Sequence, residues 1–180
     1  MRRKVEDIRI DDAPSLDTLA RRMEAAGGFS AKSVAQGVDL LVRIMKDEEM
    51  TTFLSFPADI VATGTRGVLF ELIRSGYIDA VVTTCGTLDH DVARSYRPYF
   101  HGEWSLDDAE LHRKGLYRLG NLVIPERNYG YIVERTMQRL LSRLWRGGMR
   151  RISSRQLTWA LGQELGENHG KGSLCRAAFE

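Results

Sequence analysis

Cysteine and proline are scarce in this sequence, long apolar runs are absent, and the charges nearly balance. The two cysteines, Cys85 and Cys175, form no CxxC pair, so the sequence supports neither a disulfide framework nor a zinc ribbon. No window reaches the roughly 18 uncharged apolar residues of a membrane span, and the amino terminus lacks the apolar core of a secretion signal. A formal net charge of +2 is too small to indicate a nucleic-acid-binding protein. We therefore expect a cytoplasmic protein that binds neither membrane nor nucleic acid.

The composition that remains is typical of a soluble globular protein. Hydrophobic residues make up 43% of the chain and charged residues 28%, with only four prolines, which excludes disorder and collagen-like repeats. A chain of 180 residues can bury one core without a metal or a disulfide. We expect a single domain over residues 1–180, with a helical amino-terminal segment over residues 1–50. In that segment, apolar residues recur at helical spacing behind a cap at Ser15 and again from Ser30.

Two apolar runs with a helical pattern between them predict a βαβ unit. Residues 51–56 and 78–84 are typical of buried strands, and residues 63–75 have the apolar spacing of a helix. Because βαβ units build parallel sheets, we predict an α/β fold with a parallel sheet flanked by helices. Residues 121–125 are a candidate third strand, but two or three strands leave the sheet incomplete in this chain. Further helices are predicted around residues 89–95, over residues 105–115, 129–145 and 153–165, and near the carboxyl terminus.

The loops that follow the two predicted strands form the candidate ligand site. In open parallel sheets, ligands bind beyond the carboxyl ends of the strands. The loops FPADIVATG and TTCGTLDHD occupy such positions, and two interpretations of them stay open. Their small residues could let the backbone approach a phosphate-bearing ligand, with helix N-termini facing the anion, or they are ordinary βα turns. Neither loop contains the GxGxxG fingerprint of dinucleotide-binding proteins.

Three titratable residues in succession, Asp89, His90 and Asp91, follow the second predicted strand. A carboxylate at this position can hold a cationic amine, and a neutral imidazole can accept or relay a proton. The alternative is a solvated helix start with Asp89 as its N-cap. Both interpretations stay open from the residues alone.

Neither a metal site nor a reactive cysteine is favoured. The other three histidines, His101, His112 and His169, share no ligand spacing with His90. Cys85 is either a nucleophile or a small residue that fills a tight strand end, and the second interpretation is favoured.

Arginines cluster between Arg143 and Arg155. Trp145 is the only aromatic residue among them, whereas a surface that stacks RNA bases needs several. The cluster therefore favours a solvated or intersubunit face.

Several stretches of the chain, in order, resemble the deoxyhypusine synthase family and its archaeal members in particular. They are GGFSAKSVAQGVDLL, TTCGTLDHDVAR, GEWSLDDAELHRKGLYRLGNLVIPERNYG, SSRQLTWALGQELGE and SLCRAAFE, which together lie between residues 27 and 180. The resemblance implies a Rossmann-like parallel fold in a homo- or hetero-tetramer with active sites at a subunit interface. It further implies an enzyme that uses NAD to oxidise spermidine. The aminobutyl group then passes by way of an enzyme lysine to one lysine of the hypusine-containing translation factor precursor.

The resemblance also assigns site residues. Asp59 stands where the family usually has asparagine, and His90 replaces one carboxylate of an acidic pair that contacts spermidine. The substrate-binding residues are then Asp89 and His90. The NAD-binding residues are Ala58, Asp59, Ile60, Val61, Ala62, Thr84, Cys85, Gly86 and His90.

The nucleophilic lysine of the family has no match in this sequence. We therefore expect the amino-terminal portion of a deoxyhypusine synthase, either truncated, cleaved or one half of a split enzyme, which is inactive alone. A carboxy-terminal portion or second subunit would complete it. Two alternatives stay open: a homospermidine synthase, whose acceptor is putrescine, and a non-catalytic structural or regulatory subunit. The lysines without a match are Lys4, Lys32, Lys46, Lys114 and Lys171.

Overall fold

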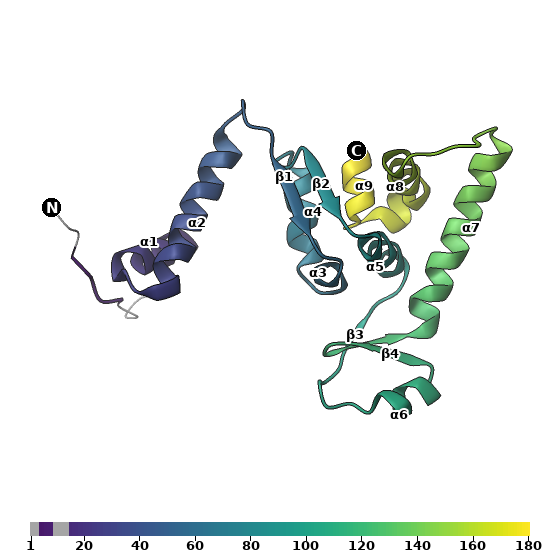
Figure 1. The fold of residues 1–180 in the computed structure, drawn as a ribbon, viewed down its shortest axis with the longest axis horizontal. Helices are drawn as coiled ribbons and strands as arrows, with labels where there is room; N and C mark the ends of the chain where they lie inside the picture. The colour runs from purple at the N-terminus through teal and green to yellow at the C-terminus, as the bar shows by residue number, and fades with distance from the viewer. Residues whose placement is uncertain (1–3, 9–14) are drawn as a thin grey trace. The chain divides into compact units, whose positions relative to one another are not determined.

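The computed structural model of the chain describes residues 4–8 and 15–180, which divide into two compact units (Figure 1). The boundary lies between Thr52 and Phe53. Within the described residues, no helix is both long enough and apolar enough to cross a membrane. The single domain expected over residues 1–180 stays a prediction.

The first unit contains two helices, α1 (Leu16–Ala26) and α2 (Phe29–Lys46). The predicted cap of α1 is confirmed, because the Ser15 side chain accepts a hydrogen bond of 3.2 Å from the backbone N–H of Thr18. The two helices pack against each other, yet Ala35 is the one residue of α2 that is buried. The predicted apolar stripe of α2 is therefore mostly exposed, with Val34 and Leu41 more than half accessible.

The predicted βαβ unit is present at the start of the second unit. Strands β1 (Phe53–Phe56) and β2 (Ala80–Thr83) are parallel, with Phe53 opposite Ala80 and Phe56 opposite Thr83. This pair confirms the α/β class. The connection holds two helices, α3 (Asp59–Ala62) and α4 (Arg66–Arg74), and not the single helix predicted over residues 63–75. The reason is Thr63, whose extended backbone ends α3.

Helix α5 (Cys85–Tyr96) follows β2 directly. It begins four residues earlier than predicted, and Thr84 takes the N-cap position. The interpretation of Asp89 as a helix cap is therefore wrong, because Asp89 lies one full turn inside the helix. The sequence pattern misplaced this start because Cys85, Gly86 and Thr87 are not strong helix formers.

A second, antiparallel sheet follows α5. Its strands are β3 (Phe100–His101), β4 (Leu116–Leu119) and β5 (Leu122–Pro125), in the order β3-β5-β4, and helix α6 (Asp108–Arg113) lies between β3 and β4 in the sequence. The expectation that residues 121–125 add a strand to the parallel sheet is wrong. They form the centre of this separate sheet, because Gly120, at a φ of 60°, reverses the chain between β4 and β5.

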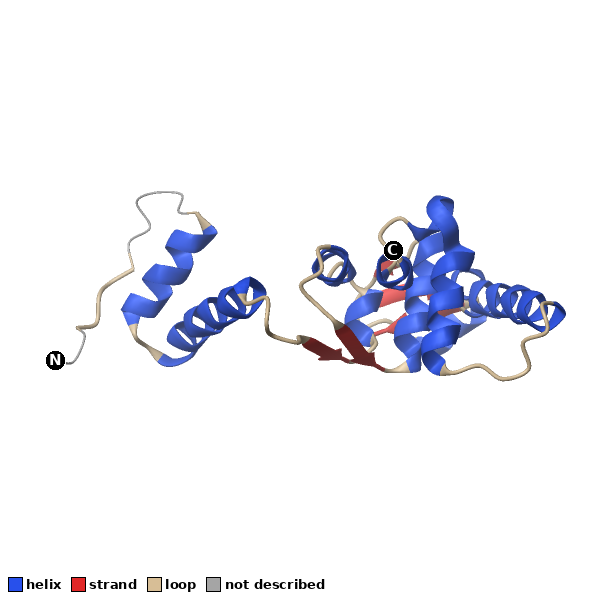
Figure 2. Ribbon diagram, turned by 90° about the horizontal axis from the view of Figure 1, so that it is seen from above, coloured by secondary structure: helices blue, strands red, loops and turns tan. Residues whose placement is uncertain are grey.

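The remainder of the second unit is helical (Figure 2). The 3₁₀ turn η1 (Glu126–Asn128) leads into α7 (Gly130–Arg146), which is followed by α8 (Ser154–Gly170) and α9 (Leu174–Phe179). A capping box between Ser153 and Gln156 starts α8.

Two apolar clusters form the core of this unit. The first joins α5, α7, α8 and α9, and the second lies where β1, α3, α4 and α9 meet. Each cluster includes one buried residue of α9, Cys175 in the first and Leu174 in the second. This short helix therefore belongs to the core. The buried members of the first are Val92, Leu140, Ala160, Leu161, Leu165 and Cys175, and those of the second are Phe56, Val61, Leu69 and Leu174.

Candidate functional site

The carboxyl ends of β1 and β2 lie side by side, as the sequence predicts for a ligand site. The Thr83 hydroxyl donates a hydrogen bond of 2.7 Å to the carbonyl oxygen of Phe56 and lies 2.6 Å from the hydroxyl of Thr87. The helices that follow the strands, α3 and α5, pack against each other. The two segments that the resemblance assigns to NAD, residues 58–62 and 84–86, are thus neighbours.

Gly86 lies directly against Ala58 of the other segment. A Cβ atom built on Gly86 would lie 2.9 Å from the Cβ of Ala58, which is too close for two carbon atoms. The sequence predicts that a ligand approaches the backbone through the small residues of this loop, and in the structure it is Ala58 of the protein that lies against Gly86. Whether a cofactor also comes close to Gly86 stays a prediction.

The N-terminus of α5 has free backbone donors. Thr84 makes no side-chain capping bond, and the described part of the chain offers no acceptor to the backbone N–H of Cys85 or Gly86. Such N–H groups, at the positive end of a helix, suit an anion such as a phosphate. The Cys85 side chain is exposed at this end.

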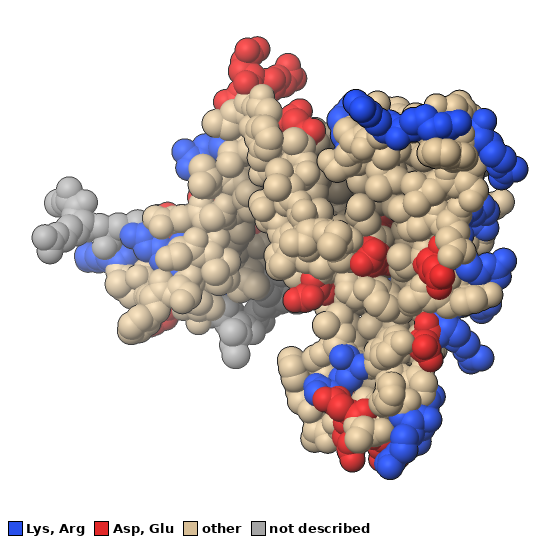
Figure 3. Space-filling model, turned by 45° about the vertical axis from the view of Figure 1, so that its right-hand side comes forward, with Lys and Arg blue, Asp and Glu red and all other residues tan. Residues whose placement is uncertain are grey.

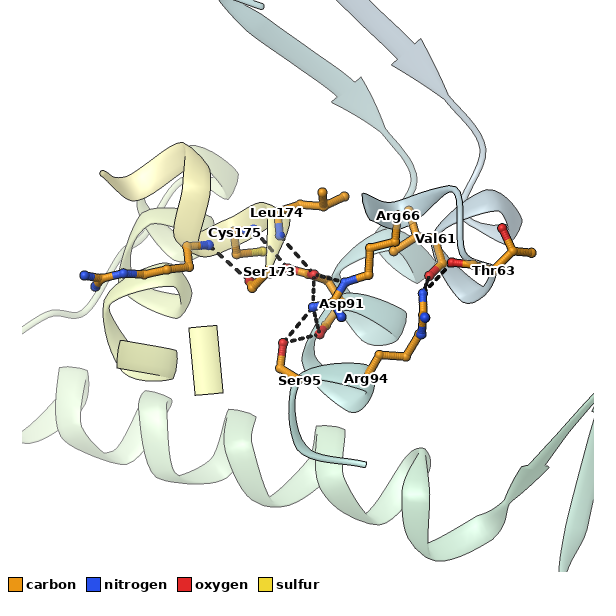
Figure 4. A network of polar contacts seen from close by, with 10 residues as sticks. Val61, Thr63, Arg66, Asp91, Arg94, Ser95, Ser173, Leu174 and Cys175 are labelled. Carbon is orange, nitrogen blue, oxygen red and sulfur yellow. Dashed lines mark hydrogen bonds and ion pairs between the residues drawn. The ribbon is translucent and has the colours of Figure 1, made fainter. Parts of the chain in front are cut away.

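The segment after β1 contains both buried and exposed side chains. Val61 and Ala62 are buried, whereas Asp59 is exposed in the first turn of α3. Arg94 of α5 donates hydrogen bonds of 2.7 and 2.5 Å to the carbonyl oxygens of Val61 and Thr63 (Figure 4). These two bonds fix the end of α3 against α5.

Asp89 and His90 lie on α5 beside two tyrosines. Burial raises the pKa of the Asp89 carboxyl, although the neighbouring His90 and the Tyr129 hydroxyl act in the opposite direction. The His90 ring is buried and stacks on the Tyr129 ring, with centroids 5.2 Å apart. Its Nδ1 lies 3.0 Å from the hydroxyl oxygen of Tyr99.

The imidazole of His90 is kept neutral at neutral pH. Burial lowers its pKa, and the Arg94 guanidinium lowers it further, against the carboxylates of Asp89 and Asp59. Burial also raises the pKa of both tyrosine hydroxyls, Tyr99 and Tyr129. The cluster therefore combines one half-buried carboxylate with a neutral imidazole and two protonated phenols.

Asp91 has a different role from its two neighbours. It is fully buried and accepts hydrogen bonds from Arg66, from the Ser173 hydroxyl and from the backbone N–H groups of Leu174 and Cys175, at 2.7 to 3.0 Å (Figure 4). Side chains two positions apart on a helix point about 200° apart, which places Asp91 away from Asp89. The carboxylate of Asp91 therefore fixes the N-terminus of α9, which is a structural role.

The sequence did not indicate the residues that surround the candidate ligand-binding residues in space. Tyr99 and Tyr129 reach His90 from 9 and 39 positions away, and Arg66 and Arg94 bind backbone and carboxylate groups on other elements. Helical spacing alone could have separated Asp91 from Asp89, but no local pattern predicts the two tyrosines. Within the described residues, no group of three or more His, Cys, Asp or Glu side chains is arranged to hold a metal ion.

Lys and Arg side chains gather along one margin of the second unit (Figure 3). The arginines near the end of α7 are exposed, as expected for a solvated or intersubunit face. Some have partners in the chain: Arg143 pairs with Glu164 at 3.1 Å, and the Arg150 guanidinium lies 3.9 Å from the centre of the Trp145 ring.

Comparison with known proteins identifies relatives over most of the chain. The sequence profile of the family "Deoxyhypusine synthase" matches residues 18–180. A "probable deoxyhypusine synthase" of Ignicoccus hospitalis is 41% identical over 98% of this chain and 53% of its own length. Another, of Picrophilus torridus, is 39% identical over 92% of this chain and 52% of its own length. The chain thus spans about half the length of these relatives.

A solved structure has the same fold. The crystal structure described as a "putative deoxyhypusine synthase" from Entamoeba histolytica superposes with a TM-score of 0.63 at 13% sequence identity. The match covers 97% of this chain and 58% of that one. At this identity the likeness bears on the fold, and it agrees with the Rossmann-like arrangement expected from the sequence.

Proposed function

Because the chain belongs to the deoxyhypusine synthase family, we propose that it forms the amino-terminal half of an NAD-dependent deoxyhypusine synthase. The complete enzyme would transfer the aminobutyl group of spermidine to one lysine of the hypusine-containing translation factor precursor. The observation that carries the proposal is the match over residues 18–180 to relatives that are about twice as long.

The residues at the carboxyl ends of β1 and β2 suit NAD. The free N–H groups of Cys85 and Gly86 would hold a phosphate of the cofactor, and the segment 58–62, fixed by Arg94, would contribute backbone groups. Asp59, exposed nearby, suits a ribose hydroxyl, because a carboxylate accepts hydrogen bonds from such groups. When bound, NAD would supply the hydride acceptor for oxidation of the amine.

Asp89 suits the polyamine. Spermidine is a trication, and its ammonium groups need carboxylate partners spaced along an extended site. Burial raises the pKa of Asp89, so an arriving ammonium group would pair with a carboxylate that is already partly removed from water. His90 and Tyr129 form the wall beside it.

The nucleophile would come from elsewhere in the assembly. None of the five lysines of this chain occupies the family's catalytic setting, so we place the nucleophilic lysine in a carboxy-terminal portion or second subunit. The 180 residues alone would then be inactive. We further propose that the complete enzyme is a cytoplasmic homo- or hetero-tetramer.

Transfer of labelled aminobutyl groups tests the proposal. The complete assembly, given NAD and radiolabelled spermidine, should label a lysine of the translation factor precursor, and the 180-residue chain should label nothing. Labelling by the chain alone contradicts the missing nucleophile. Transfer to putrescine in place of the precursor indicates a homospermidine synthase, and absence of both transfer and NAD binding indicates a non-catalytic subunit.

A further inference from the structure

Two tyrosines from outside α5 fix the ring of His90. Tyr99 follows α5 and its hydroxyl oxygen lies 3.0 Å from Nδ1, while Tyr129 precedes α7 and stacks on the ring at an interplanar angle of 26°. The Tyr99 and His90 rings meet nearly edge to face, at 82°. The orientation of the imidazole is therefore set before any ligand arrives.

The direction of the bond between Tyr99 and His90 follows from its hydrogens. The Tyr99 hydroxyl carries one hydrogen, and in the described part of the chain Nδ1 of His90 is its hydrogen-bond partner. If Nδ1 donated to the hydroxyl, the hydrogen of this part-buried phenol would have no acceptor among the described protein atoms, whereas the opposite direction satisfies both groups. The hydroxyl therefore donates, and Nδ1 accepts with its lone pair.

We propose that Tyr99 is a positioning residue that holds neutral His90 in the tautomer with its hydrogen on Nε2. With Nδ1 used by Tyr99, Nε2 is the ring atom left for a ligand, and it offers a hydrogen. An N–H donor suits an oxygen acceptor, such as a ribose hydroxyl or carboxamide oxygen of NAD, and does not suit an ammonium group. This assignment of ligands rests on the proposed function: His90 serves the cofactor and Asp89 the polyamine.

The charged groups around His90 are consistent with a neutral ring. The carboxylates of Asp89 and Asp59 favour protonation, whereas burial and the Arg94 guanidinium oppose it, and the balance lies on the neutral side. The two tyrosines stay protonated because burial raises their pKa. A proton added to Nδ1 at acidic pH would also compete with the hydrogen donated by Tyr99.

Solid-state ¹⁵N NMR of histidine-labelled protein tests the tautomer directly. At a pH above the histidine pKa, the signals lost in His90→Gln should be those of a ring protonated at Nε2 and not at Nδ1. Tyr99→Phe, which keeps the ring and removes the hydroxyl, should give a mixture of tautomers. A hydrogen on Nδ1 in the unmodified protein, or an unchanged tautomer in Tyr99→Phe, would overturn the proposal.

Calorimetric titration of the complete assembly with NAD and with spermidine tests the division of roles. Tyr99→Phe should weaken NAD binding by about threefold to tenfold, the range of one hydrogen bond, and leave spermidine binding unchanged. Tyr77→Phe, which removes an exposed hydroxyl on the loop before β2, is the matched control and should change neither.

The two proposals fail in different ways. Weaker spermidine binding with unchanged NAD binding in Tyr99→Phe overturns the assignment of His90 to the cofactor and leaves the proposed function intact. Absence of NAD binding in the unmodified assembly overturns both the proposed function and that assignment. The tautomer is decided by the NMR spectrum in either case.

Discussion

The carboxylate of Asp91 and the guanidinium of Arg66 form an ion pair inside the second unit, with Oδ1 2.7 Å from Nη2. Asp91 is completely buried and Arg66 is 8% exposed. Arg66 also binds the Ser95 hydroxyl at 2.8 Å, so α4 is tied to two turns of α5. Because both charges are removed from water, each depends on the other, and loss of one leaves an uncompensated charge.

Replacing Asp91 with asparagine should therefore destabilise the fold strongly. Removing one partner of a buried ion pair costs about 3–5 kcal/mol. The two carboxylate oxygens also accept hydrogen bonds from Arg66 and from three donors at the start of α9, whereas asparagine has a single acceptor oxygen. We expect the free energy of unfolding, measured by urea denaturation, to fall by about this amount.

The control is an exposed pair of the same type. Asp108 and Arg118 form a bidentate ion pair with distances of 2.6 and 2.8 Å, but the side chain of Asp108 is 67% exposed. Asp108→Asn should change the free energy of unfolding far less than Asp91→Asn, because water and salt screen this exposed pair. If Asp91→Asn yields no folded protein, Ser173→Ala is the milder variant: it removes the hydroxyl that donates to Asp91 and caps α9 by accepting from the backbone N–H of Arg176, and should cost about 1–3 kcal/mol. Equal, small losses in Asp91→Asn and Asp108→Asn would contradict the assigned role of Asp91.

Gly86→Ala should destabilise the contact between α3 and α5. The added methyl group would meet the Cβ of Ala58 at 2.9 Å, and overpacking of this kind costs about 1–3 kcal/mol. The double variant Ala58→Gly/Gly86→Ala removes the clash and should recover much of the loss on thermal denaturation. Gly67→Ala is the control, because a Cβ there meets nothing within 4 Å, and in a helix alanine should be neutral or stabilising.

The same double variant separates packing from cofactor binding at Gly86. If a cofactor also approaches this residue, NAD affinity of the complete assembly stays at least about tenfold weaker even when stability is recovered. Full recovery of NAD affinity together with stability would show that Gly86 serves the contact with Ala58 alone.

His90 should make stability depend on pH. Because burial lowers its pKa in the folded state, the unfolded chain binds a proton that the folded chain does not, over the interval below about pH 6.5. Stability contributed by this residue therefore rises with pH in that interval and is lost as the pH falls from 7 toward 5. In His90→Gln, the slope of unfolding free energy against pH should be smaller by up to about 1.4 kcal/mol per pH unit.

The pH dependence of stability also contains a contribution from Asp89, so the experiment needs a control variant. The raised pKa of Asp89 acts with the opposite sign, because the folded chain then holds a proton above the usual carboxyl range, so its contribution falls as pH rises. His112→Gln, at an exposed position of α6, is the control and should keep the slope of the unmodified protein. Identical slopes in both variants would contradict a perturbed His90.

Asp89→Asn should affect ligand binding more than folding. Asp89 does not cap α5, and burial already disfavours its charge, so the free energy of unfolding at neutral pH should change by less than about 0.5 kcal/mol or increase. If it holds an ammonium group in the complete assembly, spermidine binding should weaken by about 1.5–3 kcal/mol while NAD binding changes little. Calorimetry measures both. A loss of stability with unaltered spermidine affinity would favour a purely structural residue.

The parallel strand pair should drive association of the isolated chain. Parallel sheets are normally covered on both faces, yet Phe53 is 69% and Val82 57% exposed. Light scattering should therefore report particles heavier than the 20.4 kDa monomer. Val82→Thr, which keeps the shape and reduces the apolar surface, should shift the average mass downward. A monodisperse 20.4 kDa particle would contradict this expectation.

The sequence predicted those features that depend on local patterns. The parallel pair, the cap at Ser15 and the neighbourhood of residues 58–62 and 84–90 all follow from apolar spacing and strand order. The start of α5 was misplaced because its first residues, Cys85, Gly86 and Thr87, are weak helix formers, so Asp89 was the first residue with the character of a cap. The antiparallel sheet was missed because its pairing depends on the reversal at Gly120. Contacts such as that of Tyr129 with His90 join distant segments, and no spacing rule anticipates them.

The bonds from Leu174 and Cys175 to Asp91 concern cooperativity as well as strength. A helix of only six residues has few hydrogen bonds of its own, and the amide hydrogens of such a helix normally exchange rapidly with water. Here the N–H groups that begin α9 are bonded to the same helix that carries Asp89 and His90. Opening of α9 would deprive the buried carboxylate of Asp91 of three hydrogen bonds, so α5 opposes that opening. Amide hydrogens at the start of α9 should consequently exchange more slowly than those of a helix of this length without such bonds.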